Sequence, residues 1–238
     1  MEKINLVYER LYSSFGPQHW WPVTKEREPA PKYHKNISLN EKQKLEICFD
    51  AILTQNTNWK NVEKAIINLN KNSLIGIKKI LKIDNKKLAE IIKSSGYHNQ
   101  KAKKLKNFCS FLLKNYNGNL NLFFGKNIKE LRVKLLSING VGPETADSIL
   151  LYTAKKPIFV IDAYTKRIMG RIGFKEETYD ELQQLFMKSL ELNEKVFNEY
   201  HALLVELGKN TCRKNPLCIQ CPINNMCNYH KTAYLRNK

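Results

Sequence analysis

The sequence contains no apolar run long enough to cross a bilayer, and its longest apolar stretches, such as Ile158–Ile161, are far too short. The first residues, Met1–Ser14, alternate charged and apolar side chains as an amphipathic helix does, and they lack the hydrophobic region of a secretory signal. Internal repeats and low-complexity tracts are also missing. We therefore expect a cytoplasmic protein with no membrane partner.

Acidic residues are scarce relative to basic ones. The chain has 22 Asp and Glu against 40 Lys and Arg, which gives a formal net charge of +18. A compositional bias toward Lys, Asn and Ile does not explain this excess, because acidic residues have not risen with the lysines. A strongly basic globular protein most often binds a polyanion, and a nucleic acid is the first candidate. The alternative is that the basic surface only keeps the protein soluble and binds no polyanion.

Strand-forming stretches are almost absent, and Pro157–Ile161 is the only one that we find. Helical periodicity dominates the rest, with turns marked by Gly, Asn and Ser. The segment Pro17–Lys35 is rich in proline, aromatic and charged residues and is expected to be an extended loop. The fold class is therefore predicted to be all-α. The predicted amphipathic helices cover residues 45–53, 62–69, 88–92, 102–113, 128–136, 145–152 and 179–190.

Cysteine is concentrated near the C-terminus. Four of the six cysteines lie within residues 212–227, in the pattern C-x5-C-x2-C-x5-C: Cys212, Cys218, Cys221 and Cys227. The lack of a secretory signal argues against disulfides and favours a metal site. Structural zinc sites usually show two close CxxC pairs, whereas only Cys218 and Cys221 form one here. The spacing favours a 4Fe–4S cluster, with zinc or no metal as alternatives. The other two, Cys48 and Cys109, are expected to be inert core thiols.

A glycine turn between two apolar helices lies in the middle of the chain. Residues 135–146 include Gly140, Val141 and Gly142, where the glycines allow a close backbone approach and Val141 can be buried between the helices. Amides at the start of the second helix then face outward, where an anion is favoured. This pattern is typical of a helix-hairpin-helix contact with phosphate. An ordinary corner between two helices is the alternative.

Asp162 follows Gly142 by twenty residues and ends an apolar run at the start of a new helix. Aspartate is among the preferred helix N-cap residues, so a purely structural cap is a strong alternative to a catalytic role.

The glycine hairpin, the aspartate and the cysteine loop together resemble the endonuclease III superfamily of DNA base-excision glycosylases, from about Leu45 to Cys227. The resemblance implies two helical lobes with a DNA-facing cleft between them, a catalytic Asp162 and a cluster that orders a basic loop. We expect a six-helix lobe over residues 36–156. It would be inserted into a second lobe made of residues 1–35 and 157–238, which carries the cluster loop 212–227.

The resemblance also implies a partner and roles for two side chains. The partner is double-stranded DNA that contains a damaged base, bound by a monomer close to the nucleoid. Asp162 would stabilise the positive charge that develops on the sugar and orient a water nucleophile. Gln55, in Leu53–Thr57, matches the glutamine that fills the gap left by the flipped nucleotide.

One residue departs from the pattern of the bifunctional members. Those enzymes carry a lysine two residues after the second glycine of the hairpin, and its amine forms a Schiff base with the sugar. This chain has Glu144 at that position, and a carboxylate forms no imine. The sequence therefore predicts a monofunctional enzyme, and an endonuclease III-like enzyme with lyase activity is the alternative.

Within the superfamily, the chain most resembles the bacterial 3-methyladenine DNA glycosylases. Trp20 and Trp21, followed by Pro22, match aromatic residues that line the base pocket of that branch. A cationic alkylated purine gains both stacking and cation–π attraction on such rings. The two tryptophans could instead attach the N-terminal loop to the core. Mismatched uracil or thymine and oxidised bases remain alternative substrates.

Two features depart from the alkyladenine branch. An alkyladenine glycosylase of that branch has no cysteine cluster, and it has a pocket lysine where this chain has Leu203.

Basic residues near these motifs are expected to contact DNA phosphates, among them Lys101 and Arg167. As a group they predict binding that weakens steeply as salt is added. A non-enzymatic alternative also stands: a metal-stabilised DNA-binding module in which Asp162 only caps a helix.

Overall fold

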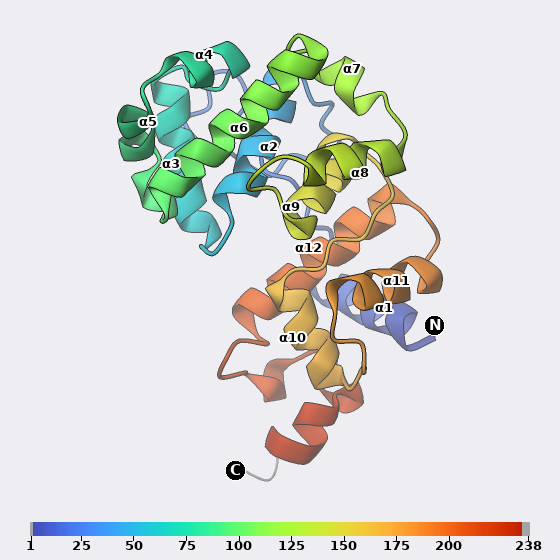
Figure 1. The fold of residues 1–238 in the computed structure, drawn as a ribbon. Coiled ribbons are helices and arrows are strands. Elements are labelled where there is room, and N and C mark those ends of the chain that lie inside the picture. Colours follow the sequence, from blue (N-terminus) through green and yellow to red (C-terminus); the bar gives the residue numbers. More distant parts are fainter. Residues whose placement is uncertain (1, 235–238) are drawn as a thin grey trace. The chain divides into compact units, whose positions relative to one another are not determined.

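The structure is a computed structural model that describes residues 2–234, and every regular element in that range is a helix (Figure 1). The only β-type pairing among these residues is an isolated bridge between Val23 and Lys32. The predicted all-α class is confirmed. None of the helices in the described range is long and apolar enough to cross a membrane.

The chain divides into two compact units. We call Trp21–Lys156 the hairpin unit, and Met1–Trp20 together with Pro157–Lys238 the cysteine unit. Residues 21–35 fall in the hairpin unit, whereas the sequence analysis grouped them with the N-terminal segment. The reason is a set of polar contacts with the helix that follows them, described below.

The hairpin unit is built around one buried helix, α2 (Glu41–Leu53), in which ten of 13 residues are buried. It contacts α3, α6, α7 and α9, while α4 and α5 lie against the long helix α6 (Figure 1). The buried set includes the polar side chains of Gln43, Glu46 and Asp50, so this helix needs hydrogen-bond partners inside the unit. The other helices of this unit are α3 (Trp59–Lys71), α4 (Ile77–Lys82), α5 (Asn85–Ile91), α6 (His98–Tyr116), α7 (Leu120–Phe124), α8 (Ile128–Leu136) and α9 (Pro143–Ser148).

Asparagine side chains start several of these helices. Asn40 accepts a hydrogen bond from Gln43 N at the start of α2, and Gln43 bonds back to complete a capping box. Asn58, Asn119 and Asn127 cap α3, α7 and α8 in a similar way. The helices predicted at 45–53 and 62–69 begin earlier in the structure because their first turns are polar, whereas the helix predicted at 128–136 has the predicted bounds. The short helices α4 and α7 were not predicted, since neither is long enough to show a clear period.

The helix predicted at residues 145–152 begins earlier and changes type. Pro143 occupies its first position, where the missing amide hydrogen removes no hydrogen bond of the helix. From Ile149 to Thr153 the chain continues as a wider π-helical turn. The predicted helix is therefore present, but only its first part is α-helical.

Two buried carboxyl groups on α2 hold the start of the hairpin unit. Glu46 accepts from Thr24 N at 2.6 Å and from Asn70 Nδ2 at 3.0 Å. One turn further, Asp50 Oδ2 accepts from Trp21 Nε1 at 2.9 Å. Burial raises the pKa of the Asp50 carboxyl well above its ordinary value; the charge of Glu46 raises it further, and the bond from Trp21 opposes the shift. These contacts place residues 21–35 in the hairpin unit.

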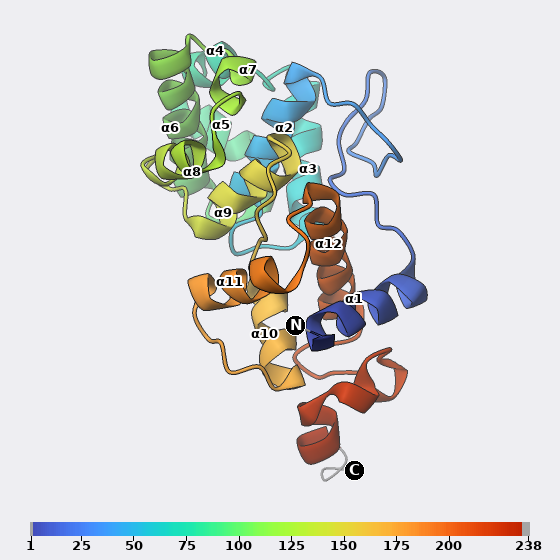
Figure 2. The ribbon, with the colours of Figure 1, turned by 90° about the vertical axis from the view of Figure 1, so that its right-hand side faces the viewer.

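The cysteine unit has an aromatic core. Phe159 stacks on Phe186 with ring centroids 3.9 Å apart, and Tyr200 packs against both rings. The Tyr200 hydroxyl donates to Ile4 O at 2.9 Å, which fixes the N-terminal helix against α12 (Figure 2). The helices of this unit are α1 (Glu2–Phe15), α10 (Ala163–Ile172), α11 (Tyr179–Ser189) and α12 (Glu194–Asn210).

The stretch Pro157–Ile161, predicted as the one strand-like segment, is extended but pairs with no strand among the described residues. Instead, the Phe159 carbonyl accepts from Gln183 Nε2 at 2.6 Å. Three of its residues, Phe159, Val160 and Ile161, are almost fully buried. The segment therefore serves as a buried connection that leads directly to Asp162.

The raised pKa of Asp50 predicts a pH-dependent effect of Asp50→Asn on stability. A carboxyl whose pKa is raised by folding stabilises the fold fully below its unfolded pKa, and this contribution disappears as pH rises through the folded pKa. The melting temperature of the variant, relative to that of the native protein, should therefore increase between about pH 4.5 and 7.5, as measured by circular dichroism.

Asp84→Asn is the matched control, because Asp84 is an exposed N-cap whose pKa is lowered by hydrogen bonds from backbone amides. The effect of Asp84→Asn on the melting temperature should stay nearly constant over the same pH range. A constant difference for Asp50→Asn as well would contradict the assignment of a raised pKa.

Candidate functional site

The glycine hairpin joins α8 to α9. Gly140 lies in the left-handed region with φ of +97°, and Val141 is 6% exposed, with its amide donating to Ile138 O. Arg132 on α8 forms a two-pronged ion pair with the fully buried Asp147 on α9, at 2.8 and 3.1 Å. This pair and the buried valine fix the angle at which the second helix leaves the turn.

The two glycines of the hairpin serve different purposes. A Cβ on Gly140 would lie 2.3 Å from Lys104 Cγ, and the positive φ also disfavours any other residue there. Gly142 has an extended backbone and no atom within 4 Å of a Cβ built on it. Packing inside the protein therefore requires glycine at position 140, while the space over Gly142 is open.

The side chain of Gln55 lies against this turn. Its Nε2 donates to Gly140 O at 3.0 Å and to Thr145 Oγ1 at 2.9 Å. Its Oε1 accepts a hydrogen bond from Lys104 Nζ. Residues that are 85 and 90 positions apart in the sequence are thus brought together, which supports treating Gln55 and the hairpin as one group.

Glu144 is an exposed residue in the first turn of α9. The amides of a first helical turn have no partner within the helix, and the helix dipole there favours negative charge. Glu144 therefore sits where a carboxylate is electrostatically favoured, one residue before Thr145 and its bond to Gln55.

Lys101, predicted to contact phosphate, is buried and bonded inside the hairpin unit. Its side chain is 2% exposed, and its Nζ donates to Leu53 O at 2.8 Å and to Ser95 O at 2.6 Å. Burial lowers the pKa of Lys101 to about 8, and the nearby charge of Lys104 adds to the shift. The amine instead satisfies carbonyls at the end of α2 and of the short 3-10 helix Lys93–Ser95.

Asp162 caps helix α10, as its position in the sequence allowed. Its Oδ1 accepts from Thr165 N at 2.7 Å, and its side chain is 12% exposed. The other oxygen, Oδ2, lies 3.8 Å from Nε2 of His201. One oxygen therefore serves the cap while the second faces a histidine.

His201 was not predicted to be a neighbour of Asp162. It lies on α12 and is 4% exposed; burial lowers its pKa, and the charge of Asp162 opposes this shift. The ring of Trp20 meets its ring edge-on with centroids 5.9 Å apart. A single histidine on an apolar helix face carries no sequence signal that would link it to a carboxylate 39 positions earlier.

The two tryptophans have different surroundings. Trp20 lies next to His201 in the cysteine unit, and Asn198 Nδ2 donates to its carbonyl at 3.1 Å. Trp21 is 8% exposed and packs edge-on against Tyr152 and Trp59 inside the hairpin unit. Trp21 therefore attaches the N-terminal loop to the core, which was the alternative role. Trp20 is the better candidate for contact with a base.

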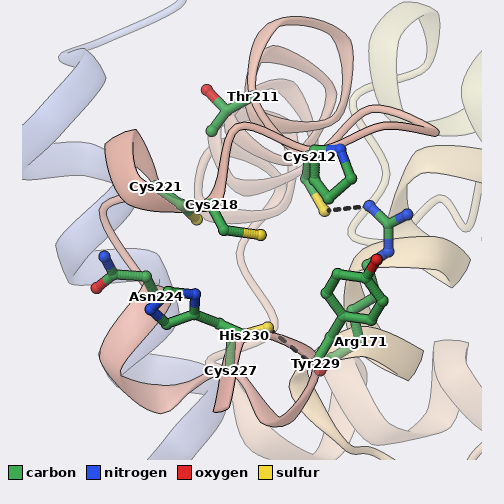
Figure 3. Close-up of a pocket in the computed structure, with 10 residues that line it drawn as sticks. Arg171, Thr211, Cys212, Cys218, Cys221, Asn224, Cys227, Tyr229 and His230 are labelled. Atoms are coloured by element: carbon green, nitrogen blue, oxygen red, sulfur yellow. Dashed lines mark hydrogen bonds between the residues drawn. The ribbon is translucent and has the colours of Figure 1, made fainter. Parts of the chain in front are cut away.

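The four cysteines of the C-terminal loop line one small pocket (Figure 3). Two short 3-10 turns, Cys218–Gln220 and Asn224–Met226, shape the loop around it. Within residues 2–234, no three His, Cys, Asp or Glu side chains converge closely enough to hold a single metal ion. A cubane does not require such convergence, because each thiolate binds a different iron.

Two of these thiols have shifted pKa values. Burial raises the pKa of Cys221 to about 11, and the other sulfurs of the loop act in the same direction. Burial also raises the pKa of Cys218. Without a nearby positive charge these two groups therefore stay protonated, and metal binding would require their deprotonation. The other two cysteines, Cys48 and Cys109, are fully buried, as expected, with strongly raised pKa values.

Arg171 holds the first part of the cysteine loop to α10. Its Nη1 donates to Cys212 Sγ at 3.2 Å (Figure 3) and to Arg213 O at 2.7 Å, and its Nη2 donates to Lys214 O at 3.0 Å. The guanidinium also lies over the ring of Tyr229 at 4.8 Å. This cation thus faces the sulfur of a cysteine and fixes the backbone that carries it.

Arg167, predicted to contact phosphate, has internal partners. Its Nε donates to Cys212 O and its Nη2 to Gly208 O, both at 2.9 Å. These bonds join α10 to the end of α12 and to the start of the cysteine loop. The contact with phosphate stays a prediction, and the internal bonds were not foreseen because the sequence does not show which of the many cations have a carbonyl within reach.

The sequence model of "HhH-GPD superfamily base excision DNA repair protein" matches residues 49–192. The match begins within α2, and it includes Gln55, the glycine hairpin and Asp162. It ends before the cysteine loop.

Similar proteins extend the comparison over most of the chain. A Methanocaldococcus jannaschii protein, provisionally named DNA repair glycosylase MJ1434, is 44% identical over 229 residues, which cover 95% of this chain and 96% of that protein. The crystal structure of Helicobacter pylori 3-methyladenine DNA glycosylase (MagIII) bound to 1,N6-ethenoadenine is similar with a TM-score of 0.70 and 29% identity, over 87% of this chain and 97% of the other. A trapped covalent endonuclease III–DNA intermediate shares the fold with a TM-score of 0.77 and 19% identity, over 100% and 98% of the two chains.

Proposed function

This chain belongs to the HhH-GPD superfamily of base excision DNA repair proteins, and we propose that it is a monofunctional glycosylase that removes an alkylated purine from double-stranded DNA. Membership of the family makes the chain a base-excision DNA glycosylase. The substrate, the absence of lyase activity and a bound 4Fe–4S cluster are the proposed part.

The carboxylate of Glu144 is the observation that carries the monofunctional assignment. It occupies the first turn of α9, at the position where the bifunctional enzymes have the amine that attacks the sugar. Lys101 has a pKa lowered to about 8, but it is buried and donates to two carbonyls. A low pKa alone does not make it a nucleophile, because the amine must also reach the sugar.

Asp162 is the proposed catalytic residue. Loss of the base leaves positive charge on the sugar, and a fixed carboxylate stabilises that charge without reorganising. The cap to Thr165 holds the carboxylate through Oδ1, and Oδ2 has the nearby His201. The same group can orient or deprotonate the attacking water.

Trp20 and the chemistry of the base support an alkylated purine. A purine methylated on a ring nitrogen carries positive charge, which strengthens its contact with an indole face and makes it a good leaving group. The similar H. pylori enzyme was solved with 1,N6-ethenoadenine, a modified purine. The base must first leave the stack, which damage makes easier.

The hairpin is proposed to bind the DNA backbone. The open space over Gly142 allows a phosphate to approach the amides of the first turn of α9. A Cβ at that position would point into this space and restrict the approach. The excess of positive charge supports the same partner.

The cysteine loop is proposed to hold a 4Fe–4S cluster through Cys212, Cys218, Cys221 and Cys227. The shared pocket and the bond from Arg171 to a sulfur support this ligand set. When bound, the cluster would cross-link four points of the loop and neutralise the thiolates. The chain's own residues carry out the excision.

Replacing Asp162 by asparagine should lower the rate of base release at least about 100-fold, since electrostatic and acid–base contributions are worth that much. Asparagine caps helices as well as aspartate does, so the fold and the affinity for DNA should be retained. Single-turnover release of the free base measures the first effect, and fluorescence anisotropy measures the second. Nearly normal release by the variant would show that Asp162 only caps α10.

Borohydride added during turnover should trap no covalent protein–DNA adduct, because a carboxylate, Glu144, occupies the position of the amine that forms the imine in the bifunctional enzymes. Glu144→Lys places an amine at the family position and should give detectable trapping on a denaturing gel. Glu144→Gln is the matched control and should give none. Efficient trapping by the native protein would overturn the monofunctional assignment.

Protein purified without oxygen should be brown and contain about four irons per chain. Cys221→Ser should lose iron and destabilise the cysteine unit, because ligation and folding are coupled. Cys109→Ala, which removes a buried thiol outside the loop, should keep the full iron content. One zinc per chain in a colourless protein would contradict the cluster.

A further inference from the structure

We propose that Lys104 is a positioning residue that fixes the side chain of Gln55 for entry into the DNA. The inference rests on the proposed function, in which Gln55 fills the space left by the flipped nucleotide. All of the residues involved lie in the hairpin unit.

The hydrogen bonds around Gln55 define the orientation of its amide. Both Nε2 hydrogens have acceptors, at Gly140 O and Thr145 Oγ1, and Oε1 has the ammonium of Lys104. The reverse orientation would point the amide nitrogen at a cation and the amide oxygen at a carbonyl. Since an ammonium only donates and a carbonyl only accepts, Lys104 and Gly140 together select one orientation.

The stem of Lys104 is held against the hairpin. Its Cγ and Cδ would lie 2.3 and 2.8 Å from a Cβ at position 140, so only a glycine leaves room for this side chain. Lys104 is half-buried, whereas the adjacent Lys103 is exposed. A lysine whose stem is packed loses less freedom when its ammonium forms a bond, so its contact with Gln55 is stronger than that of an ordinary surface lysine.

This arrangement connects the turn that is proposed to bind phosphate with the side chain that is proposed to enter the duplex. In the free protein, Gln55 is already held at the hairpin in one orientation. Ordering a side chain on binding weakens affinity, and a side chain ordered beforehand avoids that loss. Lys104 therefore raises the affinity for DNA in which a base has been displaced. This effect is separate from any attraction between its charge and a phosphate.

A double-mutant cycle tests this role. The measurement is the affinity for a duplex that contains a stable tetrahydrofuran abasic analogue, in the native protein and in Lys104→Met, Gln55→Met and the double variant. Methionine keeps the stem that packs on Gly140, and melting temperatures check that each variant is folded. Lys103→Met, alone and with Gln55→Met, is the matched control for the loss of one positive charge.

Lys104→Met should weaken binding about tenfold in the native background, as expected for a bond to a charged group, and less than about twofold in the Gln55→Met background. Lys103→Met should weaken binding less than Lys104→Met does in the native background. The factor should be the same with Gln55 and with Gln55→Met. Equal effects of Lys104→Met in the two backgrounds would overturn the proposal and make Lys104 a phosphate contact.

A second measurement needs neither DNA nor catalysis. The side-chain amide hydrogens of Gln55 should exchange slowly with solvent in the native protein and faster in Lys104→Met, as followed by NMR. Unchanged exchange would also contradict the proposal. A native protein that binds the analogue with the predicted coupling but releases no base would disprove the glycosylase assignment while leaving the role of Lys104 intact.

Discussion

Helix α10 of the cysteine unit links the candidate carboxylate to the cysteine loop. Its N-terminus is fixed by the bond from Thr165 N to Asp162, which places one carboxylate oxygen and leaves the other facing His201. One and two turns later, Arg167 and Arg171 bond to the backbone of the loop and to one of its sulfurs. A ten-residue helix thus positions the group proposed to do the chemistry and is held by the loop proposed to bind the cluster.

This connection suggests why a cluster would occur in an enzyme whose chemistry uses no redox step. Gly208 lets α12 approach Tyr164 on α10, where a Cβ would lie 2.6 Å from a ring atom. The cysteine loop begins directly after α12 and returns to α10 through the two arginines. Cross-linking the loop would therefore fix α10 and, with it, the orientation of Asp162.

The hairpin unit uses buried polar groups for a different purpose. Lys101 donates to one carbonyl at the end of α2, that of Leu53, two residues before Gln55, and Lys104 bonds to the Gln55 side chain from the next turn of α6. Two lysines on one helix thus fix the backbone and the side chain of the same short segment. Their positive charge contributes to the basic composition, but the internal partners show that part of this charge is structural.

The sequence predicted those features that depend on local pattern. The cysteine spacing, the glycine turn and the apolar run before Asp162 are each defined within a few residues, and the structure places them in one loop, one turn and one helix start. Such features can be predicted from the sequence because backbone geometry near a glycine or a helix cap depends on neighbours in the chain.

The sequence did not predict partners that only tertiary packing reveals. Lys101 and Arg167 look like exposed cations in the sequence, yet both donate to carbonyls of other elements. Trp20 and Trp21 are adjacent and look alike, but Trp21 bonds to the buried Asp50 while Trp20 meets His201. No periodicity or spacing identifies such long-range neighbours.

Release of the base itself is the most direct test of the central claim. Duplexes containing 3-methyladenine, 1,N6-ethenoadenine, uracil or an oxidised base would each be incubated with the protein, with the free base measured by chromatography and strand length measured before and after alkali. The account predicts free alkylated purine and a strand that stays intact until alkali is added. Strand cleavage without alkali, or no free base from any of these duplexes, would contradict it.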